Sequence, residues 1–272
     1  MPINIDLTGH TALVTGSTQG VGRSIALHLA AAGANLVLHG KHIDDHGQAT
    51  LAECEAHDVE VSLIEGDLSG PTESCVERVF QEATSRAPHI DLLVNNAGTY
   101  RDTSFLDISV SSFEQTMRLN VSAYFFLTQA FAKRWIEHKV HGRVLMIGSI
   151  NGRLAEPTHA GYDTSKGAVE MMVRTLCVEL APQDIRVNGL APGLFVTPLT
   201  QPALHDATMR QWMETHTPNG KVPHANVAGT AAAFLLSDAA EHIHGHMLMV
   251  DGGMSIWQQP DPPSPTKTER ET

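Results

Sequence analysis

The sequence predicts an α/β fold in which one Rossmann-type, doubly wound parallel sheet carries helices on both faces. Short apolar runs alternate along the chain with segments of helical spacing. A glycine-rich loop joins the first apolar run to the first helical segment, and polar residues follow the ends of later runs. Such apolar runs are typical of parallel strands, because helices bury both faces of a parallel sheet.

Seven strands and one domain follow from this pattern. We expect a first helix over 23–32, which has helical spacing and is followed by Gly33. Neither a linker nor a repeat interrupts residues 6–255, so a dinucleotide-binding catalytic domain is expected over 1–257. Residues 258–272 are polar and proline-rich, and a disordered C-terminal tail is expected there. The expected strands lie at residues 11–15, 35–39, 60–64, 90–94, 142–147, 185–190 and 246–250.

Composition argues against several kinds of protein. The chain has 272 residues, 42% of them hydrophobic, and a formal net charge of -12. An acidic chain repels phosphate backbones, which argues against nucleic acid as a partner. The three cysteines form no CxxC pair, so a reducing compartment is expected. The sequence shows no signal-peptide pattern and no apolar run of membrane-spanning length, so we expect a cytoplasmic protein with no membrane partner.

The glycine-rich loop is a candidate phosphate site. Its glycines have the spacing TGxxxGxG and let the backbone approach a pyrophosphate. The N-terminus of the following helix offers unpaired N–H groups and the positive end of its dipole. Three glycines alone are compatible with a simple turn, but their position between strand and helix favours a dinucleotide site. The expected contacts are Gly16, Ser17, Gln19, Gly20, Val21 and Gly22.

Tyr162 and Lys166, four residues apart, are the candidate acid–base pair. Residues at i and i+4 share a helix face, and a lysine ammonium there lowers a tyrosine pKa toward the range of a general acid–base. Ser149 follows the fifth strand and is placed to hydrogen-bond a substrate oxygen. Asn120 lies in the helical stretch 117–126, where asparagine is a mediocre helix former. That local conflict points to a functional role.

Together these residues resemble the short-chain dehydrogenase/reductase family, and the resemblance covers residues 6–256. It implies an NAD(P)-dependent oxidoreductase that moves a hydride between a nicotinamide and an alcohol or ketone carbon. The matching segments are Thr15 to Gly22, Asp67-Leu68, Asn95 to Gly98, Asn120, Ser149, Tyr162 with Lys166, Pro192-Gly193 with Thr197, and Val250 to Gly253.

The resemblance also implies a role for each residue. Tyr162 would exchange a proton with the substrate oxygen, which Ser149 would orient. Lys166 would lower the pKa of Tyr162 and bind the nicotinamide ribose, and Asn120 would hold a water that links Lys166 to solvent. The other implied cofactor contacts are Asp67, Leu68, Asn95, Ala97, Gly98, Pro192, Gly193 and Thr197.

The end of the second strand bears on the choice of nicotinamide. NAD-preferring relatives carry an acidic residue there, which repels a 2′-phosphate, whereas this chain has Gly40 and Lys41. A cation at Lys41 would pair with the phosphate of NADP, although a solvated lysine at a strand end is an equally good interpretation. Asp44 and Asp45 nearby would oppose a phosphate. On balance we expect NADP(H) rather than NAD(H).

The substrate is expected to be a small alcohol or ketone. Asn151 and His159 flank the segment between the candidate serine and tyrosine, and they suit a hydroxylated substrate, although loop residues facing water are equally compatible. Phe195, a further candidate for substrate contact, precedes the segment 199–224, which is expected to cover the substrate as a lid. Trp212 in that segment is a candidate for substrate contact or for packing. No metal is expected, because no carboxylate or cysteine clusters with the alternating histidines of 242–246.

Three functions remain open. The stretches 187–193 and 245–254 resemble gluconate 5-dehydrogenases, which implies a sugar acid or polyol as substrate. They also resemble 3-oxoacyl-carrier-protein reductases, against which the net charge counts because the carrier protein is acidic. A non-catalytic, nicotinamide-binding regulator is the third, and the complete catalytic set argues against it. A homotetramer is expected, with the apolar run 228–236 and strand 246–250 as its interface.

Overall fold

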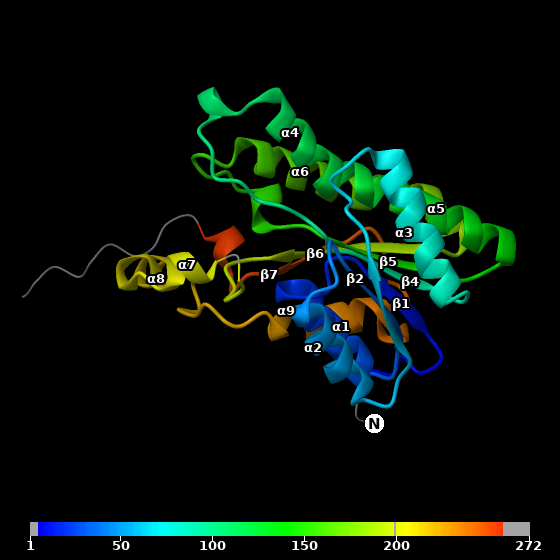
Figure 1. Ribbon diagram of the computed structural model, residues 1–272. Helices are drawn as coiled ribbons and strands as arrows, with labels where there is room; N and C mark the ends of the chain where they lie inside the picture. Colours follow the sequence, from blue (N-terminus) through cyan, green and yellow to red (C-terminus); the bar gives the residue numbers. More distant parts are fainter. Residues whose placement is uncertain (1–4, 199, 258–272) are drawn as a thin grey trace, which may run out of the picture.

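The computed structural model describes residues 5–198 and 200–257, in which a seven-stranded sheet carries helices on both faces (Figure 1). All neighbouring strands are parallel, in the order β3-β2-β1-β4-β5-β6-β7. The predicted doubly wound fold is confirmed, and each strand lies within two residues of its expected bounds. The strands are β1 Thr11–Val14, β2 Asn35–Gly40, β3 Val61–Glu65, β4 Leu92–Asn95, β5 Arg143–Ile147, β6 Arg186–Pro192 and β7 Met247–Val250.

The helices form one layer on each face of the sheet (Figure 1). The lower layer in that view contains α1 Gly20–Ala31, α2 Asp45–Glu55 and α9 Asn226–Leu236. The upper layer contains α3 Thr72–Arg86, α4 Val110–Met117, α5 Ala123–His138 and α6 Ala160–Leu180. Two short helices, α7 Gln201–Leu204 and α8 Ala207–Thr215, project beyond one end of the sheet. The first helix begins at Gly20 rather than at the expected Arg23, so the glycine loop itself forms its first turn.

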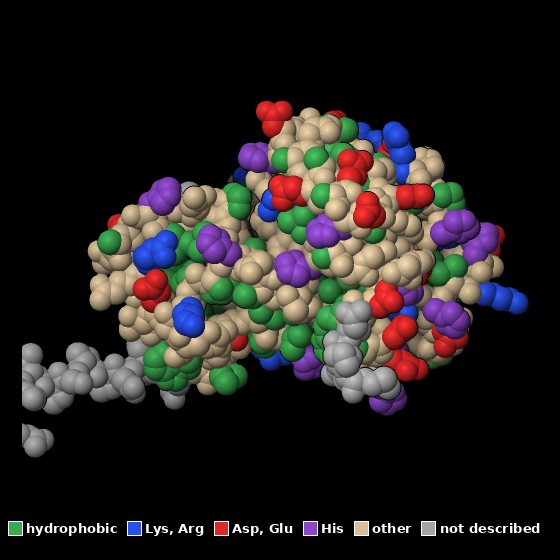
Figure 2. Space-filling view, turned by 90° about the horizontal axis from the view of Figure 1, so that it is seen from below, with side chains coloured by type: hydrophobic (Ala, Val, Ile, Leu, Met, Phe, Trp, Pro, Cys, Tyr) green, Lys and Arg blue, Asp and Glu red, His purple; other side chains and the backbone are tan. Residues whose placement is uncertain are grey.

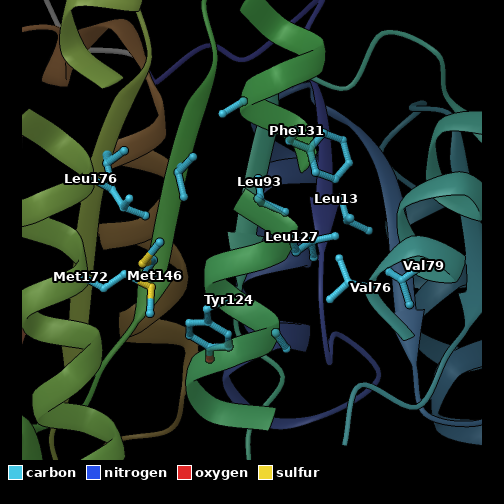
Figure 3. Close-up of a cluster of buried hydrophobic side chains, with 14 of the residues drawn as sticks. Leu13, Val76, Val79, Leu93, Tyr124, Leu127, Phe131, Met146, Met172 and Leu176 are labelled. Atoms are coloured by element: carbon cyan, nitrogen blue, oxygen red, sulfur yellow. The ribbon is translucent and has the colours of Figure 1, made fainter. Parts of the chain in front are cut away.

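Side chains that alternate in direction along the strands contribute to two apolar cores, one on each face of the sheet. Leu13 and Leu93 point to the upper layer, where they pack with Leu127 and Phe131 of α5 (Figure 3). The intervening residues of β1, such as Val14, join the lower core against α1 and α9. Successive side chains of a strand point to opposite faces, so one continuous apolar run serves both layers. This explains why the strands read as uninterrupted apolar runs in the sequence.

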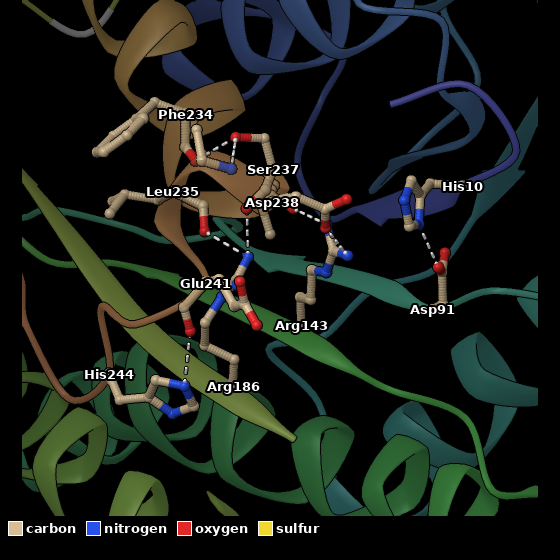
Figure 4. A network of polar contacts seen from close by, with 12 residues as sticks. His10, Asp91, Arg143, Arg186, Phe234, Leu235, Ser237, Asp238, Glu241 and His244 are labelled. Atoms are coloured by element: carbon tan, nitrogen blue, oxygen red, sulfur yellow. Dashed lines mark hydrogen bonds and ion pairs between the residues drawn. The ribbon is translucent and has the colours of Figure 1, made fainter. Parts of the chain in front are cut away.

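Two arginines close the C-terminal end of α9 (Figure 4). The buried Arg186 donates from Nη2 to the carbonyl oxygens of Ser237, at 2.7 Å, and Leu235, at 3.3 Å. Arg143 donates from Nη1 to the Leu236 carbonyl at 2.6 Å. The last carbonyls of a helix have no partner within the helix, and a guanidinium there satisfies them and complements the helix dipole. The contacts tie α9 to β5 and β6.

Helix α9 buries one of its sides within the chain, and its other side is partly exposed. Its residues Ala228, Ala232 and Leu236 are buried against α1 and the sheet. The expectation that 228–236 takes part in a subunit interface stays a prediction, which the partly exposed side of the helix with Ala231 and Phe234 would serve. Strand β7 differs, since it is the last strand in the sheet order and is half-buried.

The two other expectations concern the tail and membranes. The predicted tail, 258–272, lies outside the described residues. Among the residues that are described, no helix is both long enough and apolar enough to cross a membrane.

Candidate active site

The carboxyl ends of the parallel strands open into a cavity of about 760 Å³. The loops after six strands contribute to its lining, through Gly16, Lys41, Asp67, Ala97, Ser149 and Gly193. The strand order reverses between β1 and β4. Ligands of open α/β sheets bind outside the carboxyl ends of the strands at such a switch point, so the fold itself marks this cavity as the candidate site.

The glycine loop allows a very close approach of backbone segments. Gly16 and Gly20 have φ angles of +63° and +60°, a conformation that favours glycine. A Cβ atom at Gly16 would lie 2.9 Å from the Cα atom of Ala97, and one at Gly22 would lie 2.3 Å from the Gly16 carbonyl oxygen. No side chain caps the N-terminus of α1. This cradle of backbone at a helix N-terminus fits a pyrophosphate.

Asn95 and Asn96 have different positions. Asn95 ends β4, is buried and donates from Nδ2 to Thr128 Oγ1 at 3.0 Å, and it does not line the cavity. Asn96 lines the cavity, and its Nδ2 donates to the carbonyl oxygens of Thr15 and Gly16, both at 2.9 Å. The cofactor contact expected at Asn95 is therefore corrected. Alternation along the strand turns Asn95 into the core and leaves its neighbour to fix the glycine loop.

His39 is a buried anchor of the glycine loop that the sequence analysis missed. Its Nδ1 accepts from the Gly16 N–H at 3.1 Å, and its Nε2 donates to the Gly66 carbonyl oxygen at 2.9 Å. Burial lowers the pKa of His39 to about 4, so the ring is neutral at physiological pH, as both contacts require. The His39 backbone N–H donates to Ser17 Oγ at 2.9 Å. That bond holds Ser17 away from the cavity lining, contrary to the expected contact.

Lys41 and Asp67 face each other at the adenosine end of the cavity. Lys41 Nζ lies 3.1 Å from Asp67 Oδ2, and both residues line the cavity together with Leu68. Burial raises the pKa of Asp67, but hydrogen bonds from Ser69 and the charge of Lys41 oppose this and bring the pKa to about 2. Asp44 also lines the cavity, and its carboxylate accepts from the Gly47 N–H at the start of α2. Lys41 at this end is thus shared with the Asp67 carboxylate.

Tyr162 and Lys166 lie on the first turns of α6, as predicted from their spacing. Lys166 is buried, donates from Nζ to the Ile147 carbonyl oxygen at 2.8 Å, and has Nζ 5.6 Å from the centre of the Tyr162 ring. Burial lowers the pKa of Lys166 to about 8. Both side chains line the cavity next to Ser149, which places an ammonium, a phenol and a hydroxyl around one space.

The pKa of Tyr162 differs from the sequence expectation. Burial raises it, while a hydrogen bond from Ser149 lowers it, and burial dominates. The lowering expected from Lys166 is therefore not the net effect in the protein itself. A phenol with a raised pKa is a proton donor at neutral pH.

Ser149 and Asn151 form a short polar turn after β5. The Ser149 hydroxyl accepts from the Asn151 backbone N–H at 3.1 Å and donates to Asn151 Oδ1 at 3.3 Å. Asn151 Nδ2 donates to Asp163 Oδ1 at 2.9 Å. These contacts fix the serine hydroxyl relative to α6, which carries Tyr162 and Asp163.

Asn120 lies in a π-helical turn, Arg118–Ser122, between α4 and α5. Its Oδ1 accepts from the Thr99 N–H at 2.8 Å, and its Nδ2 donates to the Thr99 carbonyl oxygen at 2.9 Å and to Ser165 Oγ at 3.0 Å. Both amide protons are thus used within the protein, and the residue is buried outside the cavity lining. A hydrogen bond between Asn120 and a water would therefore have to go to the side-chain or backbone carbonyl oxygen of Asn120. π-Helical turns are frequent at functional sites.

The substrate end of the cavity is polar on one side. Tyr100 and Arg101, from the loop after β4, line it with Gln115 of α4 and with His159. Arg101 is exposed and donates from Nη2 to Gln115 Oε1 at 2.7 Å. The sequence analysis missed Tyr100, Arg101 and Gln115, because nothing in their spacing marks them.

The segment after β6 supplies apolar residues to the same end. Phe195 lines the cavity as expected, and so does Met213 of α8. Trp212 does not line it, since its ring stacks on His216 with ring centroids 4.2 Å apart and is 45% exposed. The substrate contact considered for Trp212 is therefore corrected. Neighbouring helix residues point about 100° apart, so Met213 takes the inward position.

Most of the other predicted site residues also line the cavity. Their lining positions are Gly16, Gln19, Gly20, Val21, Gly22, Lys41, Asp67, Leu68, Ala97, Gly98, Ser149, Asn151, His159, Tyr162, Lys166, Pro192, Gly193, Phe195 and Thr197.

Known proteins match almost the whole chain. The family model described as Enoyl-(Acyl carrier protein) reductase matches residues 16–255. L-rhamnose 1-dehydrogenase (NADP(+)) of Thermoplasma acidophilum is 33% identical, over 93% of this chain and 98% of that protein. The 5-keto-D-gluconate 5-reductase of Escherichia coli is 32% identical, over 92% of this chain and 97% of that protein. A crystal structure of a gluconate 5-dehydrogenase from Burkholderia cenocepacia, in complex with NADP and tartrate, is 32% identical with a TM-score of 0.86, over 94% and 98% of the two chains.

Proposed function

Because the chain belongs to the short-chain dehydrogenase/reductase family, we propose that it interconverts a keto sugar acid and the corresponding alcohol, with Tyr162 exchanging the proton. The chain is an NAD(P)-dependent oxidoreductase that acts on CH–OH groups. The observation that carries the proposed site is the meeting of Ser149, Tyr162 and Lys166 with the glycine loop in one cavity.

The cavity fits a nicotinamide dinucleotide. The backbone cradle at Gly16 and Gly22 suits the pyrophosphate, and Lys41 suits the adenosine end. Pro192, Gly193 and Thr197 line the other end and would hold the nicotinamide portion. When bound, the nicotinamide supplies or accepts the hydride.

The proton is handled by the protein. Tyr162 donates its phenolic proton to the substrate oxygen during reduction and takes the alcohol proton during oxidation. Ser149 donates a hydrogen bond to the same oxygen as negative charge develops there. Lys166, held by the Ile147 carbonyl oxygen, stabilises the phenolate that remains on Tyr162.

NADP(H) is the cofactor that we propose for this site. Lys41 follows β2 directly and lines the cavity, where its ammonium suits the 2′-phosphate. The relatives named for NADP and the structures that contain it support the choice. Asp67 weakens the preference, because it shares the Lys41 charge.

A sugar acid is the proposed substrate because of Arg101. Its exposed guanidinium lies at the cavity next to Tyr100, whose ring centre is 5.5 Å from that of Tyr162. A planar guanidinium matches a carboxylate with two parallel hydrogen bonds. Two of the similar proteins are named for gluconate or its keto form, and tartrate is bound in one of the similar structures.

Initial rates with NADPH test this proposal. We expect turnover of 5-keto-D-gluconate, and we expect Arg101→Ala to raise the KM for this acid about tenfold but to leave the KM for the neutral keto sugar fructose nearly unchanged. Arg101→Lys, which keeps the charge, is the matched control and retains part of the effect. Turnover of a 3-oxoacyl thioester but not of the keto acid would instead assign the chain to acyl-chain reduction.

A further inference from the structure

A second phenol lies in the same cavity as Tyr162 and has no part in the chemistry above. Tyr100 follows β4, and its ring meets the Tyr162 ring edge to face, with ring centroids 5.5 Å apart and an interplanar angle of 85°. Both residues line the cavity. A substrate whose carbonyl oxygen meets Tyr162 therefore shares the cavity with Tyr100.

The Tyr100 hydroxyl is the end of a short polar chain. It lies 2.8 Å from Nε2 of His159, and Nδ1 of that ring lies 3.2 Å from Oε2 of Glu156. The His159 side chain is only 13% exposed. The Nδ1 contact has the distance of an ion pair but not the angles of a hydrogen bond. The carboxylate, the imidazole and the phenol thus follow one another toward the cavity.

The row of polar side chains formed by Glu156, His159 and Tyr100 is held in place from both sides. The Glu156 backbone N–H donates to Asp163 Oδ2 at 3.1 Å, which ties this end to α6. The backbone N–H of Thr103 donates to the Thr158 carbonyl oxygen at 2.9 Å, which ties the Tyr100 loop to the loop of His159. Two segments far apart in the sequence are thereby fixed around one hydroxyl group, and a fixed polar group selects its ligands better than a mobile one.

We propose that Tyr100, positioned by His159 and Glu156, binds the hydroxyl group on the carbon next to the reacting carbonyl, and so selects α-hydroxy ketones and vicinal diols. The inference rests on the oxidoreductase function proposed above, and not on the carboxylate or on Arg101. With the carboxylate of Glu156 facing Nδ1, that nitrogen carries the proton and Nε2 accepts from Tyr100. The Tyr100 oxygen is then left to accept a hydrogen bond from the substrate.

The ionisation of Tyr100 fits a binding role rather than an acid–base role. Burial raises its pKa, and the nearby carboxylates of Asp102 and Glu156 raise it further. The phenol therefore stays protonated at neutral and moderately alkaline pH, so it does not compete with Tyr162 for the substrate proton. A site built to bond a hydroxyl group discriminates strongly against an analogue that lacks it, because its own polar groups are then left unpaired.

The test compares two ketones that differ only in that hydroxyl group. With NADPH, kcat/KM is measured for acetoin and for butanone in the wild type, in Tyr100→Phe and in His159→Phe. We expect the wild type to prefer acetoin, and either substitution to lower the acetoin/butanone ratio about tenfold. The double variant should lose little more than either single variant, because the two residues act as one unit. Tyr124→Phe is the matched control, since that buried phenol does not line the cavity, and it should leave the ratio unchanged.

Three outcomes would overturn the inference. One is a wild type that turns over neither ketone or that shows no preference for acetoin. A second is an equal loss of kcat/KM for both ketones in Tyr100→Phe, which indicates a purely structural role. A third is additive losses in the double variant. Failure of the sugar-acid proposal is recognised separately, since it appears as no turnover of 5-keto-D-gluconate while the acetoin preference remains.

Discussion

Burial decides the charge of the individual residues at this site. It raises the pKa of Tyr162 and lowers the pKa of Lys166 to about 8. Both shifts favour the neutral form of the side chain, as expected where water is excluded. The protein alone therefore keeps the Tyr162 phenol protonated near neutral pH, which is the form that the reduction direction requires.

The two directions of the reaction should respond oppositely to pH. Reduction needs the Tyr162 proton and the Lys166 charge, so its kcat/KM should stay level at neutral pH and fall as pH rises through about 8. Oxidation needs the phenolate, so its rate should rise with pH. Initial-rate profiles in both directions check this. Tyr162→Phe should lose turnover in both directions while still quenching or enhancing NADPH fluorescence. An oxidation rate that is flat across the alkaline range would contradict the assignment.

The proposed cofactor preference involves one exposed ion pair, between Lys41 and Asp67. Lys41→Ala should raise the KM for NADPH about tenfold, which corresponds to the loss of a charge-assisted hydrogen bond, and it should change the KM for NADH little. Asp67→Asn should have the opposite effect, because it releases Lys41 from its partner 3.1 Å away. Kinetics with both cofactors at two salt concentrations measure this. Equal changes for NADPH and NADH in Lys41→Ala would refute a 2′-phosphate contact.

At the scale of elements, helix ends and an irregular helix turn set the geometry of the site. The π-helical turn Arg118–Ser122 places Asn120 where its amide joins Thr99, on the loop after β4, to Ser165 on α6. The N-terminus of α1 forms the phosphate cradle. At the opposite end of the fold, α9 is closed by arginines from β5 and β6.

Loss of the buried arginine at the end of α9 should destabilise the fold. Arg186→Met leaves the carbonyl oxygens of Leu235 and Ser237 without their charged donor, and we expect it to lower the free energy of unfolding by about 2–3 kcal/mol. Arg86→Met is the control, because its exposed pair with Glu82 is worth under about 1 kcal/mol. Urea denaturation of both variants measures the difference. Equal midpoints would show that Arg186 contributes no more than a surface residue.

At the scale of the whole molecule, apolar side chains remain exposed on the upper layer rather than on α9. They belong to α4, α5 and α6 and are Val110, Phe113, Phe125, Phe126, Ile136, Met171 and Val178. The opposite, lower face shows scattered carboxylates and histidines, with lysines and arginines as isolated groups and no continuous basic patch (Figure 2). Exposed apolar clusters mark interaction surfaces, so the homotetramer predicted from the sequence would use the α4–α6 face.

This location gives the oligomer prediction a test. Light scattering should give the wild type four times the mass of one chain. The double substitution Phe125→Glu and Phe126→Glu should reduce that mass to a dimer or monomer, because it places charges in an apolar contact. Ile43→Glu, at an exposed residue between β2 and α2, is the control and should leave the mass unchanged. A monomeric wild type would refute the prediction.

Local patterns were sufficient to predict the seven strands and to select candidate residues that the fold brings to one cavity. Apolar runs fixed the strands, because a parallel sheet buries both faces, and the spacing of Tyr162 and Lys166 placed them on one face of α6. The sequence pattern failed where it had to choose between two neighbouring residues of the same type. Asn95 and Asn96 are identical in type, and only the direction of the strand end distinguishes the inward side chain from the one that fixes the glycine loop.

The sequence alone therefore determined the fold class, the glycine loop, and the serine, tyrosine and lysine of the site, because each is encoded in short-range periodicity or spacing. Only the tertiary structure decided which other residues line the cavity beside them. His39 reaches the cavity from β2, whereas Tyr100 and Arg101 reach it from the loop after β4. Contacts between segments far apart in the chain depend on how strands are ordered and twisted, and that information is absent from any local window of sequence.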